Sequence, residues 1–255
     1  LEIIAKKSRN HTEIMFQNLK IPMIIKKKSK FDFISISTPE KIKKININIP
    51  GDISSSAFFI VLTLLSKNSK LLIKNININP SRIGIIKILN RMGGNIKLLN
   101  KKKNNNEECA DIFVESQKKL NKINCPVGLN SSAIDEFLII FLAAAKANGV
   151  STFKNLSELN QKESPRLKIA AKILKMVGIK VTSNDSSIKI YGNPNLKINK
   201  KVIIKNYMKD HRVFMMSVIA ALSLGGDWRI HDPESVKTSF PSFIKIINHL
   251  GGKIN

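Results

Sequence analysis

The sequence repeats one pattern of elements three times after residue 50, and this repetition constrains the fold more than any other feature. Each repeat runs from an apolar helix through a strand into a second helix that ends at glycine, and another strand follows. The repeats cover about residues 50–127, 128–200 and 201–255. Because one such unit cannot bury its apolar faces alone, we expect the three units to share a core, with helices inside and sheets outside.

The apolar spacing also predicts where the elements of each repeat lie. In the first repeat we expect a helix at Phe58–Leu65, a strand at Lys70–Ile76, a helix ending at Gly93-Gly94, a strand at Asn95–Leu99 and an exposed polar hairpin tip at 100–110. In the second we expect a helix at Asp135–Ala147, a strand at Ser151–Leu156, a helix ending at Gly178 and a strand at Ile179–Thr182. In the third we expect a helix at Val213–Leu222, a strand at Asp227–His231 and a helix ending at Gly251-Gly252.

The residues before the repeats form a separate segment. A helical stretch from Ser8 to about Leu19 is followed by two strand-like runs, at Ile21–Ile25 and Phe31–Ser37. The sequence Pro50-Gly51-Asp52 then interrupts the chain sharply, as proline and glycine do in turns.

Three clusters of ionic residues fall near predicted helix starts. They are Asp135-Glu136, Lys162-Glu163 with Arg166, and Asp210-His211-Arg212. Ser164 followed by Pro165 is typical of a helix N-cap, and helix N-termini favour bound anions.

Taken singly, each cluster has an ordinary explanation, because aspartates commonly cap helices and surface ion pairs contribute little. A histidine at a helix start is also more often structural than catalytic. Together, however, the clusters would offer arginine and lysine for anionic groups and carboxylates for proton transfer. The sequence has no glycine-rich nucleotide loop and no activated serine or cysteine nucleophile.

The net charge of +25 would ordinarily suggest a polyanionic partner. Lysine, isoleucine and asparagine are abundant throughout, even in predicted strands, as an A+T-rich coding sequence would produce. Since the lysines form no stripe and few aromatic residues accompany them, we expect no specific nucleic acid partner. No apolar run is long enough to span a membrane. Cys109 and Cys125 lack the spacing of a metal site or a disulfide framework, so we expect no metal and a cytoplasmic protein.

Several motifs occur together and in order along the chain. They are Ser8-Arg9-Asn10-His11-Thr12-Glu13, Pro50-Gly51-Asp52-Ile53-Ser54-Ser55, Asn160-Gln161-Lys162-Glu163-Ser164-Pro165-Arg166-Leu167, Asp210-His211-Arg212-Val213-Phe214-Met215 and Thr238-Ser239-Phe240-Pro241. With these motifs the chain resembles the EPSP synthase family, the 3-phosphoshikimate 1-carboxyvinyltransferases of the shikimate pathway. The resemblance covers nearly the whole chain but only the C-terminal part of the family's full sequence.

The resemblance implies an inside-out α/β barrel of the enolpyruvyl transferase type, with two domains of three βαβαββ units each. Residues 1–49 would end the N-terminal domain, which binds shikimate-3-phosphate, and residues 50–255 would form the C-terminal domain. The implied reaction transfers the enolpyruvyl group of phosphoenolpyruvate to the 5-hydroxyl of shikimate-3-phosphate and releases phosphate, without metal or organic cofactor. We expect a monomer, and little turnover by this chain without the missing N-terminal domain.

The resemblance also implies roles for individual residues. Those for shikimate-3-phosphate are Asp135 as the catalytic carboxylate beside the 5-hydroxyl, Lys162 near the same hydroxyl, and Ser8 as a contact. Those for phosphoenolpyruvate are Glu163 as the acid that protonates its methylene group, Arg166 and Arg212 as the clamp on its anionic groups, His211 as a supporting residue, and Lys237 as a possible ligand.

The chain departs from the family pattern at a few positions. Pro165 replaces a usual aspartate, Lys209 stands where asparagine or glycine is common, and Thr238 stands where some members have the lysine that binds phosphoenolpyruvate. Glu158 falls at a substrate-contacting asparagine of some members and receives no role. The alternatives are a UDP-N-acetylglucosamine enolpyruvyl transferase of the same fold, a basic nucleic-acid-binding module and a catalytically silent relative.

Overall fold

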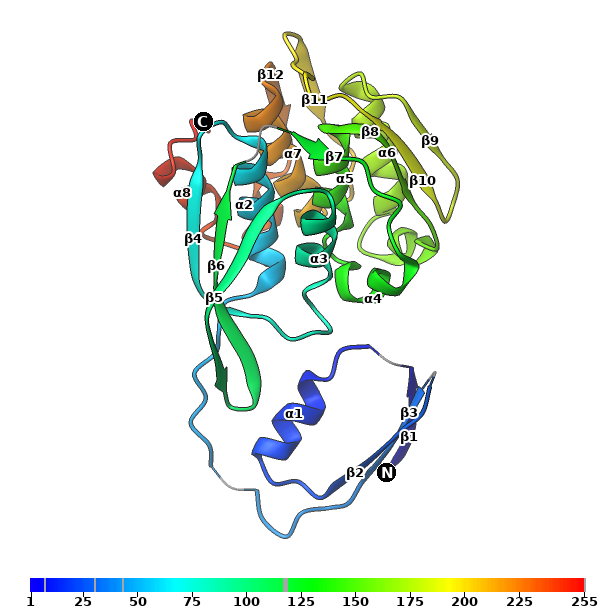
Figure 1. Ribbon diagram of the computed structural model, residues 1–255, viewed down its shortest axis with the longest axis vertical. Coiled ribbons are helices and arrows are strands. Elements are labelled where there is room, and N and C mark those ends of the chain that lie inside the picture. The colour runs from blue at the N-terminus through cyan, green and yellow to red at the C-terminus, as the bar shows by residue number, and fades with distance from the viewer. Residues whose placement is uncertain (7, 30, 43, 117–118, 255) are drawn as a thin grey trace.

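The chain forms a small N-terminal segment and a larger body, joined by an extended connection (Figure 1). The computed structural model describes residues 1–6, 8–29, 31–42, 44–116 and 119–254. The segment contains β1 (Glu2–Lys6), α1 (His11–Asn18), β2 (Met23–Lys27) and β3 (Phe31–Ile36). Its strands form an antiparallel sheet in the order β1-β3-β2. The predicted helix and two strands are confirmed to within a few residues, and β1 is an additional strand.

The larger body contains the remaining elements in three consecutive groups. The first group is α2 (Ile53–Leu65), β4 (Lys70–Asn77), α3 (Gly84–Arg91), β5 (Asn95–Asn104) and β6 (Glu107–Glu115). The second is β7 (Leu120–Asn121), η1 (Val127–Leu129), α4 (Asn130–Ala133), α5 (Phe137–Ala145), β8 (Ala147–Phe153), η2 (Ser157–Gln161), α6 (Arg166–Met176), β9 (Val181–Ser183) and β10 (Ile188–Gly192). The third is β11 (Lys201–Ile204), α7 (His211–Leu224), β12 (Asp227–Ile230), η3 (Pro233–Val236) and α8 (Phe243–His249).

The core of this body is built around helices α2, α5 and α7, which pack against one another. Every residue of α5 is buried, as expected for a helix that is apolar on all sides. The rings of Phe141 and Phe153 meet edge to face with centroids 5.1 Å apart. Burying each large apolar side chain stabilises the fold by about 1.5–3 kcal/mol. The three apolar helices that begin the sequence repeats therefore form a single shared core.

Three sheets lie around these helices (Figure 1). The first has the antiparallel order β4-β6-β5, the second the order β7-β8-β10-β9, and the third is the parallel pair β11-β12. The predicted α/β architecture, with helices inside and sheets outside, is confirmed.

The polar stretch at 100–110 is mostly strand and not loop. Strands β5 and β6 continue to Asn104 and from Glu107, so only Asn105 and Asn106 form the tip of the hairpin. Both have positive φ angles, of 47° and 59°, which asparagine tolerates better than most residues. The tip contacts α1, because Asn18 Nδ2 donates to the Asn105 carbonyl oxygen at 2.6 Å. The polar residues of this stretch therefore lie on the outer part of a hairpin, whereas Cys109 and Ala110 at its end are buried.

The helix predicted at Asp135–Ala147 is wrong at both ends. Helix α4 ends at Ala133 and α5 begins at Phe137, so Asp135 and Glu136 lie in the turn between two helices. Strand β8 already begins at Ala147, where it pairs in parallel with Leu120 of β7. The carboxylates of Asp135 and Glu136 therefore project from a turn and not from a helix. Asp135 is the centre of the site described next.

None of the helices in the described ranges is long and apolar enough to cross a membrane.

Candidate active site

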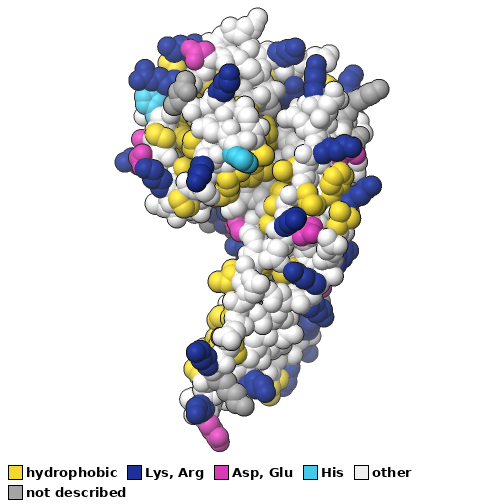
Figure 2. Space-filling view, turned by 90° about the vertical axis from the view of Figure 1, so that its left-hand side faces the viewer, with side chains coloured by type: hydrophobic (Ala, Val, Ile, Leu, Met, Phe, Trp, Pro, Cys, Tyr) yellow, Lys and Arg dark blue, Asp and Glu magenta, His cyan; other side chains and the backbone are white. Residues whose placement is uncertain are grey.

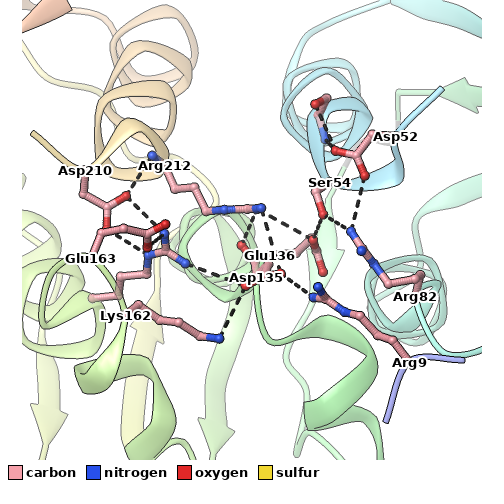
Figure 3. A network of polar contacts seen from close by, with 12 residues as sticks. Arg9, Asp52, Ser54, Arg82, Asp135, Glu136, Lys162, Glu163, Asp210 and Arg212 are labelled. Atoms are coloured by element: carbon pink, nitrogen blue, oxygen red, sulfur yellow. Dashed lines mark hydrogen bonds and ion pairs between the residues drawn. The ribbon is translucent and has the colours of Figure 1, made fainter. Parts of the chain in front are cut away.

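Asp135 lies at the centre of a group of four cationic side chains (Figure 3). It accepts a hydrogen bond from Arg9 and lies 3.7 Å from Lys162 Nζ. Its carboxylate oxygens also lie 3.8 Å from Arg166 Nη1 and 4.0 Å from Arg212 Nη2. The Asp135 side chain is 14% exposed, so solvent screens these interactions only partly. One carboxylate thus contacts four cations from three separate parts of the chain.

The surroundings of Asp135 keep its carboxyl group ionised. Burial acts to raise its pKa, but the charge of Arg212, the hydrogen bond and charge of Arg9 and the charge of Lys162 lower that pKa to about 2. Asp135 is therefore a carboxylate at neutral pH and can accept a proton or a hydrogen bond there.

Arg166 is buried at the start of α6 and joins two carboxylates. Its Nε donates to Asp210 Oδ2 at 2.9 Å, and its Nη2 donates to Glu163. Its side chain is 2% exposed, which excludes the interpretation of Arg166 as a surface ion pair. Together with its 3.8 Å approach to Asp135, these contacts make Arg166 the link between all three ionic clusters found in the sequence.

Ser164 does not cap α6, contrary to the sequence prediction. The residue before that helix is Pro165, and no side chain caps it. The Ser164 hydroxyl donates to Asp210 Oδ2 at 2.8 Å instead. The buried carboxylate competes successfully for the hydroxyl, since a hydrogen bond to an ionised acceptor is stronger than one to a neutral group.

Asp210 both caps α7 and binds the arginine of α6. Its Oδ1 accepts a hydrogen bond from the backbone N–H of Arg212 at 2.9 Å. Burial acts to raise the pKa of Asp210, and the hydrogen bonds and charge of Arg166 and the hydrogen bond of Ser164 lower it overall. The capping interpretation is thus correct but incomplete.

Arg212 extends from the start of α7 to the turn that holds Asp135. Its Nη1 donates to the Asp135 carbonyl oxygen at 2.8 Å and lies 3.8 Å from Glu136 Oε1. The preceding residue, His211, is half-buried, and burial followed by the charge of Arg212 lowers its pKa. His211 is therefore neutral at neutral pH and can serve as a hydrogen-bonding group beside the arginine.

Lys162 and Glu163 lie at the exposed edge of the group. Lys162 Nζ binds Glu158 at 2.8 Å and faces Asp135 on its other side. The Glu163 side chain is 54% exposed and pairs with Arg166. Glu158, which received no role from the sequence, thus neutralises part of the lysine's charge.

Two predicted residues have no contact with this group in the described ranges. Ser8 is exposed and lines a cavity of about 690 Å³ beside Arg9 and the loop at Asn79. Lys237 forms an exposed ion pair with Glu234, at 2.7 Å. The structure therefore brings together Asp135, Lys162, Glu163, Arg166, His211 and Arg212 and leaves these two outside.

Sequence reasoning gave no individual role to four residues of the network: Arg9, Ser54, Arg82 and Glu136. Arg9 and Ser54 stood within the quoted motifs and Glu136 within the first ionic cluster, so these positions were the available signal. Arg82 lies in no quoted motif. It donates to Ser54 Oγ at 2.6 Å and pairs with Asp52, a contact that only the fold creates.

The side chains of the described residues form no cluster of three His, Cys, Asp or Glu groups that could bind a metal ion. Lysine and arginine side chains outside the site are spread over the face drawn in Figure 2 and do not gather in one stripe. This face therefore lacks the continuous basic track typical of nucleic-acid binding.

Comparisons with known proteins agree on one family. Residues 1–247 match the family described as EPSP synthase (3-phosphoshikimate 1-carboxyvinyltransferase). The chain is 36% identical over 248 residues to the 3-phosphoshikimate 1-carboxyvinyltransferase of Ruthia magnifica, covering 97% of this chain and 55% of that protein. It is 37% identical over 241 residues to the protein of that name from Staphylococcus aureus, covering 93% and 53%. The chain thus spans about half the length of the curated relatives it matches.

Solved structures show the same fold. EPSP synthase from Acinetobacter baumannii superposes with a TM-score of 0.87 at 32% identity, covering 97% of this chain and 56% of that one. The enolpyruvyl transferase NikO from Streptomyces tendae superposes with a TM-score of 0.70 at 14% identity, covering 100% of this chain and 56% of that one, a likeness of fold alone.

Proposed function

Because the chain belongs to the EPSP synthase family, we propose that its protein transfers the enolpyruvyl group of phosphoenolpyruvate to the 5-hydroxyl of shikimate-3-phosphate. The C–O bond between the enolpyruvyl carbon and phosphate breaks, a new C–O bond forms to the hydroxyl oxygen, and inorganic phosphate leaves. Both substrates are anionic, and so is the tetrahedral adduct between them. A site for this reaction needs fixed positive charge and groups that transfer protons.

The observation that carries the proposal is the group of four cations around one ionised carboxylate. Arg9, Lys162, Arg166 and Arg212 all lie within 4.0 Å of Asp135. Arginine binds carboxylate and phosphate groups with its planar fork, and a positioned set of such groups needs little reorganisation when charge develops. Anionic substrates would therefore compete with Asp135 for these cations.

We assign the hydroxyl chemistry to Asp135 and Lys162. Asp135, held ionised by its cationic neighbours, accepts the proton of the 5-hydroxyl as the oxygen attacks. Lys162 lies beside the same carboxylate and contacts shikimate-3-phosphate near this hydroxyl. Ser8 contributes a further contact to shikimate-3-phosphate from the N-terminal segment.

We assign phosphoenolpyruvate to Arg166 and Arg212. Glu163, bound to Arg166 and partly exposed, donates a proton to the methylene carbon, which makes the neighbouring carbon electrophilic. When phosphate leaves the tetrahedral adduct, the resulting methyl group gives up a proton and the carbon–carbon double bond re-forms. His211 supports the site in its neutral form, and Lys237 is a possible additional ligand. Pro165 removes a carboxylate usual in the family, and here the Asp210 carboxylate holds Arg166 on its inner side.

We further propose that residues 1–49 end an N-terminal domain that binds shikimate-3-phosphate and that residues 50–255 form a C-terminal domain of three βαβαββ-like units. The complete protein would then contain more N-terminal sequence, act as a monomer in the cytoplasm and need no cofactor. The Arg9–Asp135 pair supports a site built from both domains, since it joins residues 126 positions apart.

The test is phosphate release from phosphoenolpyruvate in the presence of shikimate-3-phosphate, measured with the complete protein. Release that depends on shikimate-3-phosphate and disappears in Glu163→Ala and Arg212→Ala would support the reaction and both roles. A folded, complete protein that releases no phosphate, or that accepts only UDP-N-acetylglucosamine, would overturn it.

A further inference from the structure

Glu136 is a buried acid beside the site for which the proposed reaction has no use. It follows Asp135 in the turn between α4 and α5 and is 1% exposed. An ionisable side chain this deeply buried costs stability unless its polar atoms have partners. The contacts of Glu136 therefore indicate what it does.

The first partner of Glu136 is Arg212, one of the two arginines assigned to phosphoenolpyruvate. Arg212 Nη1 lies 3.8 Å from Glu136 Oε1 and donates to the Asp135 carbonyl oxygen at 2.8 Å. The arginine side chain has several rotatable bonds, so holding it in one geometry before an anion arrives removes an entropic cost of binding. The Asp135 carbonyl oxygen accepts a hydrogen bond from Arg212 Nη1, and the Glu136 side chain attracts the same nitrogen electrostatically. Together these two contacts hold the guanidinium group in place.

The second partner of Glu136 is Ser54, near the start of α2. The Ser54 hydroxyl lies 2.5 Å from Glu136 Oε1, and its oxygen also accepts a hydrogen bond from Arg82 Nη2 at 2.6 Å. Because a guanidinium group can only donate, Arg82 occupies a lone pair of the hydroxyl and leaves the Ser54 proton for Glu136. Arg82 thereby orients the serine toward the acid.

Arg82 is in turn fixed from two directions. Its Nη2 lies 3.3 Å from Asp52 Oδ1, and Asp52 caps α2 by accepting from the Ser55 backbone N–H at 2.9 Å. Arg82 also precedes α3, which begins at Gly84 and packs closely against Ser132 of α4. A continuous set of polar contacts thus runs from the start of α2 through Arg82, Ser54 and Glu136 to Arg212 (Figure 3).

We propose that Glu136 is a positioning residue for Arg212, with Ser54 and Arg82 as the groups that fix the Glu136 carboxyl. The identity of the anion that Arg212 receives rests on the proposed function, whereas the placement of Arg212 by Glu136 does not. Ser54 hydrogen-bonds to Oε1, whereas Arg212 Nη1 faces the same oxygen at 3.8 Å without a hydrogen bond. The arrangement therefore needs an oxygen with partial negative charge at this position and does not need a formal charge there.

The electrostatics of Glu136 agree with this distinction. Burial raises the pKa of Glu136 overall, against the Ser54 hydrogen bond and the charges of Arg212 and Arg82. Glutamine has the same shape and presents a carbonyl oxygen where the glutamate presents Oε1. Glu136→Gln is therefore the conservative variant, and Glu136→Ala removes the acceptor.

The kinetic test uses the complete protein and compares the two substrates. In Glu136→Ala, which removes the oxygen facing Arg212, and in Ser54→Ala, which removes the hydroxyl that fixes this oxygen, we expect the KM for phosphoenolpyruvate to rise about 10-fold because Arg212 is less well positioned before the anion binds. The KM for shikimate-3-phosphate should change by less than about twofold, and Glu136→Gln should restore most of the phosphoenolpyruvate KM. Ser217→Ala is the matched control, because it removes another buried serine hydroxyl, one that donates to the Val213 carbonyl oxygen within α7 and lies outside the polar network of the site.

A purely structural role would lower the folded fraction or shift both KM values together, and either result would overturn the proposal. A crystal structure of Glu136→Ala supplies a readout that needs no turnover, even if the wild-type protein releases no phosphate and the proposed function fails. A guanidinium group of Arg212 that leaves the Asp135 carbonyl oxygen would support the positioning role. One that keeps this hydrogen bond unchanged would refute it.

Discussion

Arg166 and Asp210 form an ion pair that is almost completely withdrawn from solvent, with Nε 2.9 Å from Oδ2 and side chains 2% and 0% exposed. Arg166 is the first residue of α6 and Asp210 is the N-cap of α7, so the pair joins the start of a helix in the second repeat to the start of a helix in the third. Removing one member of a buried pair leaves an uncompensated charge in the core, which is more damaging than replacing both.

Asp210→Ala is accordingly expected to destabilise the fold by about 3–5 kcal/mol. The variant leaves the Arg166 guanidinium buried but removes the buried carboxylate that pairs with it. The variant also loses the cap of α7. Urea unfolding measures the change. Asp185→Ala, which breaks an exposed pair with Lys168, should change the free energy of unfolding by less than about 0.5 kcal/mol. Equal effects of the two variants would contradict the buried-pair argument.

The stability of the fold should depend on pH through Asp135. The pKa of Asp135 is about 2 in the folded chain, below the value of about 3.9 in an unfolded chain. The folded state therefore binds this proton less tightly, so the contribution is complete above the unfolded pKa and is lost as pH falls through the folded pKa. Its size is about 2–3 kcal/mol.

The measurement is urea unfolding of wild type and Asp135→Asn between about pH 6 and about pH 2. We expect the variant to be less stable at the upper end, because four cations lose their common anion, and the difference to shrink below about pH 4. A difference that stays constant over this range would show that the charge of Asp135 is not its source.

Arg212→Lys should impair phosphoenolpyruvate binding although it keeps the positive charge. Lysine cannot reproduce the arginine fork, which here donates to the Asp135 carbonyl oxygen while facing Glu136. We expect the KM for phosphoenolpyruvate to rise by about 10-fold or more. Steady-state kinetics on the complete protein measures this, with Lys168→Ala as a charge-removal control on the exposed face of α6. A normal KM in Arg212→Lys would mean that charge alone suffices.

Gly84→Ala should destabilise the fold for a steric reason. A Cβ at Gly84 would lie 2.6 Å and 2.7 Å from the backbone carbon and oxygen of Ser132, which cannot move without shifting α4. We expect a loss of about 1–3 kcal/mol in the free energy of unfolding. Gly128→Ala is the matched control, since a Cβ there meets nothing within 4 Å. Thermal unfolding of both variants decides the point, and a neutral Gly84→Ala would show that α3 and α4 separate easily.

The repeat and its core could be predicted from the sequence because they depend on local apolar patterns. Phe58–Leu65 and Val213–Leu222 were recognised as helices, and the structure extends them to Ile53–Leu65 and His211–Leu224. The aspartates at their starts, Asp52 and Asp210, do cap them. Periodicity and capping act over a few residues, so a sequence shows them directly.

The contacts of the site could not be predicted in the same way. Arg9 and Asp135 are 126 residues apart, and nothing in either local pattern indicates that they meet. The continuous apolar run of α5 concealed the turn at Asp135, and Ser164 had an ordinary capping role available that the buried Asp210 displaced. Which hydrogen bond or ion pair each of these side chains forms depends on groups that are distant in the sequence and meet only in the folded chain.

The turn between Ala133 and Phe137 should not tolerate inserted residues. A residue inserted there would rotate one flanking helix by about 100° relative to the other, given 3.6 residues per turn. Either Asp135 would leave its four cations or α5 would present different side chains to a core that surrounds it on all sides. At the Asn105–Asn106 hairpin tip, by contrast, an insertion leaves the core helices in place and disturbs only the hydrogen bonds between the tip and Asn18 of α1. Length variation among natural or engineered variants should therefore concentrate at the hairpin and be absent from the turn.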